Sequence, residues 1–576
     1  MKVFIANLKL VWRFAKYQKK NIIKTTIWKI IIMIISVVVP LISAKIIVNL
    51  TDNKIYQCLM FVVLMFVIEN LRNFAIYFSN CFSQVVFRET MVLMQKSLGD
   101  AMLKLETKVI DDDGSGVFIQ RLTNDVSLLS DEFSSINNYF GNIITNIGIF
   151  VAIFVINKWI FLYSVLYTIL LYYIFKKRNY LYNEKKKIYK KEAEITTGFI
   201  GELVRGIRDI KMLNSEKSFL NKMEDNVVSL NNSAYDMNTV QRNYTLISGF
   251  TYDFGDFILQ FIIGLSILYE KITIPNGIIL FNYSGRVIDL GRTLDSFSKE
   301  IKDFNLASER VFSIIDGDDY KKEEFGSIHL KKVNGDFEFK NVSFAYDKNK
   351  VLKNLNFKIN ANETVAFVGK TGAGKTTIFS LLCKMYDNYE GEITIDNIDI
   401  KKLDKDSIRG NITIISQNPY IFHMSIKENL KLVKGNLTKK EMIEACKAAS
   451  LHDFIMTLPK KYDTIIGEGG VNLSGGQKQR LAIARALVQK TEIILFDEAT
   501  SALDNETQMH IQKAIENMKN EYTILIIAHR LSTIINADRI LFLDNGKITA
   551  SGTHKELLKN CPAYKNLYES EITKDS

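Results

Sequence analysis

The chain has 576 residues, a length typical of two or more domains. Its composition is 47% hydrophobic with only 5 prolines, which favours long helices. Much of the formal net charge of +11 lies beside apolar stretches, near the N-terminus and at 176–191, and this placement indicates the cytoplasmic face of a membrane and argues against nucleic-acid binding.

The first 300 residues contain six stretches long and apolar enough to cross a hydrocarbon core, which needs about 20 residues. The first of them lacks a short hydrophobic region with a cleavage motif, so we interpret it as a span and not as a signal peptide. The third and fourth are separated only by Asn157, Lys158 and Trp159, which predicts a tight hairpin. The predicted spans are 26–50, 55–78, 139–156, 160–175, 244–269 and 277–297.

The placement of lysine and arginine predicts the orientation of these spans. The short connections at 51–55, 157–159 and 270–276 carry one lysine each, whereas the first 25 residues and the long connections at about 79–138 and 176–243 each carry several lysines and arginines. Both termini and both long connections are therefore expected in the cytoplasm. The long connections have apolar residues at three- and four-residue spacing, so the spanning helices are expected to continue into the cytosol.

Ionisable side chains inside the predicted spans need an explanation, because each is costly in hydrocarbon. A polar cavity that faces a substrate would explain them. Ion pairs between helices, or positions on helix segments outside the bilayer, would explain them as well, and the sequence leaves these alternatives open. The candidates for the cavity are Glu69, Arg72, Asp253, Asp256, Arg286 and Asp289, with Arg292 continuing the last series.

After about residue 336 the pattern changes to that of a soluble domain. The stretches "FEFKNVSFAYD" and "LKNLNFKI" alternate with period two, which predicts half-buried antiparallel strands. The next segment, "ETVAFVGKTGAGKTTIFSLLCKMY", reads as a buried strand, a glycine loop and a helix, the context of a phosphate-binding loop.

Each residue type in this loop suits nucleotide binding. The glycines permit backbone N–H groups to turn onto phosphates, Lys375 supplies a charge at the β/γ oxygens, and Thr376 supplies a hydroxyl for Mg²⁺. The predicted nucleotide-binding residues are Gly369, Lys370, Thr371, Gly372, Ala373, Gly374, Lys375, Thr376 and Thr377, of which Lys370 is expected to face solvent.

A second element of the predicted nucleotide site, a strand followed by acidic residues, lies in "EIILFDEATSALD". Ile493 to Phe496 predict a buried strand that ends at two carboxylates. Asp497 is expected to hold Mg²⁺, and Glu498 is placed to take a proton from the attacking water.

Four motifs, "GKTGAGKTT", "LSGGQKQR", "ILFDEATSALD" and "ILIIAHRLSTI", occur in this order. Together they resemble ATP-binding cassette (ABC) transporters, and with the six spans the chain is similar to an exporter-type half-transporter. The resemblance implies a multidomain membrane protein: an all-α six-helix transmembrane domain followed by an α/β P-loop ATPase domain with an antiparallel β subdomain and a helical signature subdomain. The expected segments are an N-terminal cytoplasmic elbow at 1–25, a transmembrane domain at 26–310, a linker at 311–335 and a nucleotide-binding domain at 336–576.

The resemblance also implies roles for single residues. Tyr346 would stack on adenine, with a buried strand tyrosine as the alternative. Gln417 would reach Mg²⁺ and the attacking water, and His529 would contact the γ-phosphate, so that the implied catalytic set is Glu498, His529 and Gln417. Residues implied to carry signals between sites or from the cytoplasmic loops are Ser501, Asp504 and Glu468.

A dimer is implied as well, because in this family two cassettes meet head to tail. ATP on one P-loop would be capped by the partner's signature residues, and a closed two-fold arrangement needs two half-transporters. The complete motifs favour a homodimer but also fit the intact member of a heterodimer. The turns near Ile110–Gly116 and Gly201–Arg208 are expected to pass cassette closure to the spans. The implied capping residues are Ser474, Gly475, Gly476 and Gln477.

The expected function is an ATP- and Mg²⁺-dependent translocase in the cell membrane, multi-pass, with its nucleotide-binding domain in the cytoplasm. It would move an amphipathic drug, lipid or peptide out of the cytoplasm by alternating access, with membrane lipids and a second half-transporter as partners and no nucleic acid. An importer of the same fold, for instance of metal chelates, shares every motif. An ATP-gated channel or regulatory subunit is a further alternative.

Overall fold

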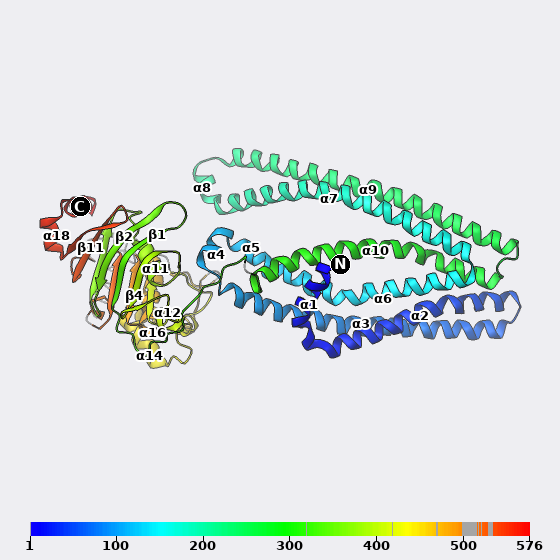
Figure 1. The fold of residues 1–576 in the computed structure, drawn as a ribbon, viewed down its shortest axis with the longest axis horizontal. Coiled ribbons are helices and arrows are strands. Elements are labelled where there is room, and N and C mark those ends of the chain that lie inside the picture. The colour runs from blue at the N-terminus through cyan, green and yellow to red at the C-terminus, as the bar shows by residue number, and fades with distance from the viewer. Residues whose placement is uncertain are drawn as a thin grey trace. The chain divides into compact units, whose positions relative to one another are not determined.

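The computed structural model describes residues 2–575 except 318, 417–418, 468–469, 498–514, 517, 520 and 528–533. The chain folds into two compact units (Figure 1). The first comprises Met1–Lys104 and Asp113–Tyr320, and the second comprises Leu105–Asp112 and Lys321–Ser576. The expected domain boundaries differ from this division, since 105–112 clusters with the second unit and the last helix of the first unit continues to Ile315.

The first unit is built from helices. Its long helices carry the predicted spans, and three of them have 48, 48 and 53 residues. At about 1.5 Å per residue these helices exceed about 70 Å, more than twice the thickness of a hydrocarbon core, so they continue beyond the core as predicted. The helices are α1 Lys2–Ala15, α2 Lys19–Thr51, α3 Ile55–Met102, α5 Ser115–Gln120, α6 Val126–Ile156, α7 Lys158–Arg205, α8 Ile207–Met212, α9 Glu216–Leu268 and α10 Ile274–Ile315.

Within the described residues, five helical stretches are long and apolar enough to cross a membrane, and they contain α2, α3, α6, α7 and α9. The predicted sixth span lies on α10, which is not among them. Charged residues such as Arg286 and Asp289 interrupt its apolar sequence. The sixth span therefore stays a prediction.

The predicted hairpin between the third and fourth spans is confirmed. Asn157 alone separates α6 from α7, with an extended backbone at φ −156°. Its side-chain oxygen accepts hydrogen bonds from the backbone N–H groups of Trp159 at 2.9 Å and Ile160 at 3.2 Å. Asparagine is a preferred N-cap because it satisfies N–H groups that have no partner inside the new helix.

Helices α7 and α9 run side by side along their length (Figure 1). The phenol of Tyr167 on α7 lies over Gly255 of α9, where an added Cβ would come within 2.2 Å of the ring. The Tyr167 hydroxyl donates to the carbonyl of Thr251 at 3.0 Å, and the Tyr163 hydroxyl donates to that of Gly255 at 2.7 Å. A residue without a side chain is thus needed for the two helices to pack this closely.

The second unit contains a four-stranded antiparallel sheet, ordered β2-β1-β4-β5, and a six-stranded sheet, ordered β12-β11-β3-β10-β9-β6. In the larger sheet, β11, β3, β10, β9 and β6 are parallel and β12 is antiparallel. The strands are β1 Phe337–Ala345, β2 Lys350–Ile359, β3 Thr364–Gly369, β4 Glu390–Ile395, β5 Ile398–Asp399, β6 Ile412–Ile415, β7 Met424–Ser425, β8 Ile465–Ile466, β9 Ile493–Asp497, β10 Thr523–Ile527, β11 Arg539–Asp544 and β12 Lys547–Gly552.

The larger sheet separates two hydrophobic cores. Alternate residues of β3 point to opposite faces, so that Ala366 and Val368 join one core while Val365 and Phe367 join the other. The strands predicted in "FEFKNVSFAYD" and "LKNLNFKI" are confirmed as the antiparallel pair β1 and β2, although β1 ends at Ala345, two residues earlier than predicted. The helices of this unit are α4 Thr107–Asp113, whose last residue belongs to the first unit, α11 Lys375–Leu382, α12 Lys405–Arg409, α13 Ile426–Lys431, α14 Lys439–Ala448, α15 His452–Thr457, α16 Gly475–Gln489, α18 His554–Asn560 and α19 Pro562–Asp575.

Candidate functional site

The glycine loop lies between the buried strand β3 and the start of α11. Gly372 and Gly374 have φ of +81° and +101°, a region that side-chain-bearing residues rarely adopt. A Cβ on Gly374 would also come within 2.5 Å of the Leu352 side chain. The loop therefore leads its backbone N–H groups into the first turn of α11, the geometry that binds anions.

Lys375 and Thr376 are the first two residues of α11. Lys375 is buried, with 5% of its surface exposed, and its ammonium donates to the loop carbonyls of Gly369 at 2.8 Å and Lys370 at 3.1 Å. This holds the charge within the loop. The Lys370 side chain is exposed, as expected.

The Thr376 hydroxyl donates to the Asp497 carboxylate at 3.2 Å. The structure brings the two together because β3 and β9 are both parallel to β10, so that Phe367 and Asp497 lie level on either side of Ile527. A hydroxyl and a carboxylate are hard oxygen donors of the kind that Mg²⁺ prefers. The donor set therefore fits the metal that the sequence predicts.

Tyr346 follows directly after β1 and is 38% exposed, so it is not a buried strand tyrosine. Its hydroxyl is hydrogen-bonded to Thr377 on α11 at 3.1 Å. The rings of Phe344 and Tyr386 meet it edge to face, with centroids at 4.9 and 5.2 Å. An exposed aromatic ring tied to the P-loop helix is suitably placed for stacking on a base, and that role stays a prediction.

The signature motif forms the start of α16. Ser474 is its N-cap: the Gln477 N–H donates to the Ser474 hydroxyl at 3.3 Å, and the Ser474 N–H donates to the Gln477 side chain at 2.9 Å. Ser474 and Gly475 are exposed, whereas Gly476 is buried. A Cβ on Gly475 would meet no atom within 4 Å. The end of this helix is thus open to a ligand or to another chain.

Several predicted residues lie outside the described part of the chain, and they keep the status of sequence predictions. They are Gln417, Glu468, Glu498, Ser501, Asp504 and His529.

The structure adds residues of the segment 105–112 to the surroundings of Tyr346. The Lys108 ammonium donates to the Tyr346 carbonyl at 3.1 Å, and the Tyr386 hydroxyl donates to the Asp111 carboxylate at 3.1 Å. Burial and this hydrogen bond raise the pKa of Tyr386 to about 12. The sequence indicated a contact turn near Ile110–Gly116, but no sequence pattern named its partners.

The charged candidates of the first unit fall into different environments. Glu69 and Arg72 form an ion pair at 2.6 Å on α3. Ion pairing is one alternative to a substrate cavity, but it is expected between helices, whereas this pair joins two residues of one helix. Asp253 is exposed, and Asp256 accepts a hydrogen bond from Gln260 at 2.6 Å. Arg286 and Asp289, in contrast, line a cavity of about 360 Å³.

Two family models match the chain in the order of its two units. The model described as ABC transporter transmembrane region matches residues 22–285, and the model described as ABC transporter matches residues 352–501. A putative multidrug export ATP-binding/permease protein of Bacillus subtilis (strain 168) is 30% identical over 97% of this chain and 98% of that protein. The chain belongs to the ABC transporter family.

Other comparisons agree with this assignment. An ATP-dependent lipid A-core flippase of Haemophilus influenzae is 31% identical over 91% of this chain and 89% of the flippase. The structure of a bacterial Atm1-family ABC exporter with ATP bound superposes with a TM-score of 0.84 at 23% identity, covering 96% of this chain and 98% of that one, which shows the common fold. This ABC transporter is therefore a half-transporter with a transmembrane domain fused to an ATP-binding domain, and it is an ATPase coupled to transport.

Proposed function

We propose that this half-transporter exports an amphipathic substrate from the cytoplasm, driven by ATP hydrolysis at two sites shared within a dimer. The observation that carries the proposal is the meeting of Thr376 and Asp497 at the carboxyl edge of the parallel sheet, beside the glycine loop, in a chain that also holds a membrane domain. The relatives whose names specify multidrug export or lipid flipping support the export direction.

ATP would bind with its phosphates at the start of α11 and its base beside Tyr346. The backbone N–H groups after Gly372 and Gly374 would hold the phosphate oxygens, and Lys375 would neutralise charge at the β/γ positions. Thr376 and Asp497 would hold Mg²⁺, which supplies charge stabilisation at the phosphates when it is bound. From the sequence, Gln417 would complete the metal environment.

Hydrolysis requires a group that accepts a proton from water. We assign this role to Glu498, which directly follows the Mg²⁺-holding Asp497, with His529 contacting the γ-phosphate. Glu498→Gln should therefore bind ATP without turning it over. Ser501, Asp504 and Glu468 are proposed to link the two sites and the cytoplasmic loops.

The second half of each site would come from the partner. The open N-terminus of α16, with Ser474 and Gly475 exposed, offers backbone N–H groups to a phosphate bound on another chain. We propose a homodimer, in the cell membrane with both termini cytoplasmic, because every catalytic motif is complete in this chain. Cassette closure would then open the transmembrane cavity outward.

Transport by the purified chain in proteoliposomes tests this function. Molecules with the nucleotide-binding domain outside should accumulate a fluorescent amphiphile in the lumen when ATP and Mg²⁺ are added outside. Lys375→Ala should abolish both accumulation and ATP hydrolysis, while Lys440→Ala, which changes an exposed lysine outside the predicted site, serves as the control.

The alternatives predict different results in this assay. An importer would release luminal amphiphile under the same conditions. A channel or regulatory subunit would equilibrate its substrate without ATP turnover. Either result would exclude the proposed export.

A further inference from the structure

The cavity that contains Arg286 and Asp289 is formed by three helices of the first unit. Its lining residues recur at three- and four-residue spacing, so each helix contributes one face. The volume of about 360 Å³ lies in the range of small-ligand sites. The polar lining side chains are Lys29 and Ser36 on α2, Asn138, Tyr139, Asn142, Thr145 and Asn146 on α6, and Arg286, Asp289, Thr293 and Ser296 on α10.

The charges in this lining do not balance. Lys29 and Arg286 are cationic, and Asp289 is the single carboxylate among the lining side chains that the structure describes. The Arg286 guanidinium lies 3.9 Å from Asp289, beyond hydrogen-bond distance. Among the described residues no carboxylate comes within 4 Å of the Lys29 ammonium, although Lys29 is half-buried.

Amides add hydrogen-bonding capacity that the protein leaves unused. The Asn138 side-chain oxygen is buried without a hydrogen-bond partner among the described residues. Asn146 is buried, and Asn142 lies between them one helical turn from each. The Tyr139 hydroxyl is already engaged, since it donates to Glu300, which is not a lining residue. An amide presents two N–H donors beside its oxygen, and these donors can hydrogen-bond an anion, whereas the unpartnered Asn138 oxygen can accept only from a hydroxyl of the same headgroup.

We propose that this cavity binds the anionic group of the transported substrate, a phosphate or carboxylate, between Lys29 and Arg286. An unbalanced positive charge in a membrane domain is costly until an anion offsets it, and a charge-assisted hydrogen bond returns about twice the free energy of a neutral one. This inference rests on the proposed transport function and specifies the substrate class.

The place of the cavity along the spans agrees with such a substrate. Lys29 and Asn138 are near the predicted cytoplasmic starts of their spans, and Ser296 is near the cytoplasmic end of the span on α10. The cavity therefore extends from the predicted level of the inner-leaflet headgroups at Lys29 to Arg286, which lies near the middle of its predicted span. An amphiphile in that leaflet presents its polar group at the Lys29 end of the cavity.

Matched amphiphiles test the proposal with the full-length chain in phosphatidylcholine nanodiscs. Dodecyl phosphate, dodecyl maltoside and dodecyltrimethylammonium share a tail but differ in headgroup charge. The measurement is the concentration of each probe that half-maximally stimulates ADP release. Dodecyl phosphate should act at a concentration at least about tenfold below the other two, as expected for a charge-assisted contact.

Variants then assign this preference to the cavity. Lys29→Gln and Arg286→Gln should each raise the half-maximal concentration of dodecyl phosphate about tenfold and leave that of dodecyl maltoside unchanged. Lys29→Arg should keep the preference. Lys24→Gln, which removes an exposed lysine from the same helix outside the cavity, should have no effect.

The outcomes separate this inference from the proposed function. Equal half-maximal concentrations for all three probes, or a shift in Lys29→Gln that is the same for all of them, would overturn the anion site while ATP-driven transport stands. A wild-type chain without ATP hydrolysis would instead reject the function itself. If inorganic phosphate competes with dodecyl phosphate, the site binds a free anion as well. If inorganic phosphate does not compete but other alkyl phosphates do, the ligand is the headgroup of a lipid.

Discussion

Thr376 and Asp497 are 121 residues apart in sequence, yet the threonine hydroxyl donates to the aspartate carboxylate at 3.2 Å. The contact exists because β3 and β9 are parallel and separated only by β10, so both residues emerge at one edge of the sheet. It is an exposed hydrogen bond, and its loss therefore costs little folding stability.

Thr376→Val should consequently separate function from stability. Removing the hydroxyl while keeping the side-chain shape should raise the Mg²⁺ concentration needed for half-maximal ATP hydrolysis by about tenfold, since one oxygen ligand is lost. Thr376→Ser, which keeps the hydroxyl, should behave like the wild type. A Mg²⁺ titration of the ATPase rate checks this, and an unchanged titration in Thr376→Val would contradict the assignment.

The segment 105–112 should carry the coupling between transport and ATP hydrolysis. Tyr386→Phe removes the hydrogen bond to Asp111, and Asp111→Asn weakens it by removing the charge of the acceptor. We expect both variants to hydrolyse ATP but to lose more than about half of the stimulation by substrate, because the contact beside Tyr346 is loosened.

The ratio of stimulated to basal ATPase rate measures this effect. Asp100→Asn provides the control, since Asp100 is an exposed acid that pairs with Lys104 just before the segment. Equal ratios in Tyr386→Phe, Asp111→Asn and the control would show that the contact does not participate in coupling.

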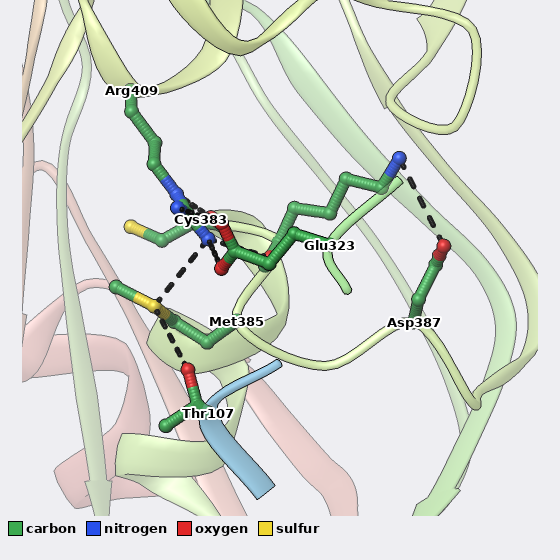
Figure 2. Close-up of polar contacts among 7 residues, drawn as sticks. Thr107, Glu323, Cys383, Met385, Asp387 and Arg409 are labelled. Carbon is green, nitrogen blue, oxygen red and sulfur yellow. Dashed lines mark hydrogen bonds and ion pairs between the residues drawn. The ribbon is translucent and has the colours of Figure 1, made fainter. Parts of the chain in front are cut away.

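Arg409 should be the strongest polar contributor to the stability of the nucleotide unit near its linker. Its guanidinium donates to both oxygens of Glu323 at 2.8 and 2.6 Å and to the carbonyls of Cys383 and Lys384 (Figure 2). The Met385 sulfur lies beside it and also accepts from Thr107, so the linker, the end of α11 and the segment 105–112 meet here (Figure 2).

Arg409→Lys keeps the charge but loses this planar geometry. The free energy of unfolding should fall by about 2 kcal/mol, seen as a melting temperature roughly 4–8 °C lower for a unit of this size. Lys350→Gln, which removes an exposed ion pair with Glu390, should shift the melting temperature by less than about 2 °C. Similar melting-temperature shifts in Arg409→Lys and Lys350→Gln would contradict the larger contribution of Arg409 to stability.

Two buried thiols should give the nucleotide unit a pH-dependent stability. Burial raises the pKa of Cys383 to about 12 and that of Cys446 to about 11. An unfolded thiol titrates near about 8.5, so this stabilisation is complete below that pH and is lost as the pH rises toward 11 or 12.

Labelling with N-ethylmaleimide at pH 8.5 reads out the thiols, because only the thiolate reacts. Cys561, which is half-exposed, should be modified in the folded chain, while Cys383 and Cys446 should react only after denaturation. Mass spectrometry of the adducts shows which cysteine is modified first. Native labelling of Cys383 as fast as that of Cys561 would contradict the burial argument.

Much of the nucleotide unit could be predicted from the sequence, because its motifs are local. Period-two alternation located β1 and β2, and the glycine spacing located the loop before Lys375. The partners of Lys108 and Tyr386 could not be predicted, since they join segments more than two hundred residues apart through tertiary packing.

The polar cavity was predicted only in part. Arg286 and Asp289 stood out as charges within a span, but Lys29 was not singled out, although it also interrupts an apolar stretch. The asparagines carried a signal, because Asn138, Asn142 and Asn146 recur every four residues along one helix face. Their convergence with α2 and α10 depends on helix packing, which no single segment encodes.

The central claim, that each ATP is bound by the P-loop of one chain and the signature helix of another, is tested most directly by mixing two inactive variants. Lys375→Ala removes the phosphate-binding charge. Gly475→Asp places a carboxylate at the open start of α16, where it has room and suits the helix dipole but repels a partner's nucleotide. Each variant alone should be inactive.

Co-assembly of the two variants should restore ATP hydrolysis to at most about a quarter of the wild-type rate, because half of randomly paired dimers would hold one intact site of two. The control is a chain that carries both substitutions, paired with the wild type and purified through a different tag on each chain so that wild-type homodimers are removed, because these mixed dimers hold no intact site. Failure of the two single variants to restore activity on mixing would contradict sites shared between copies of this chain.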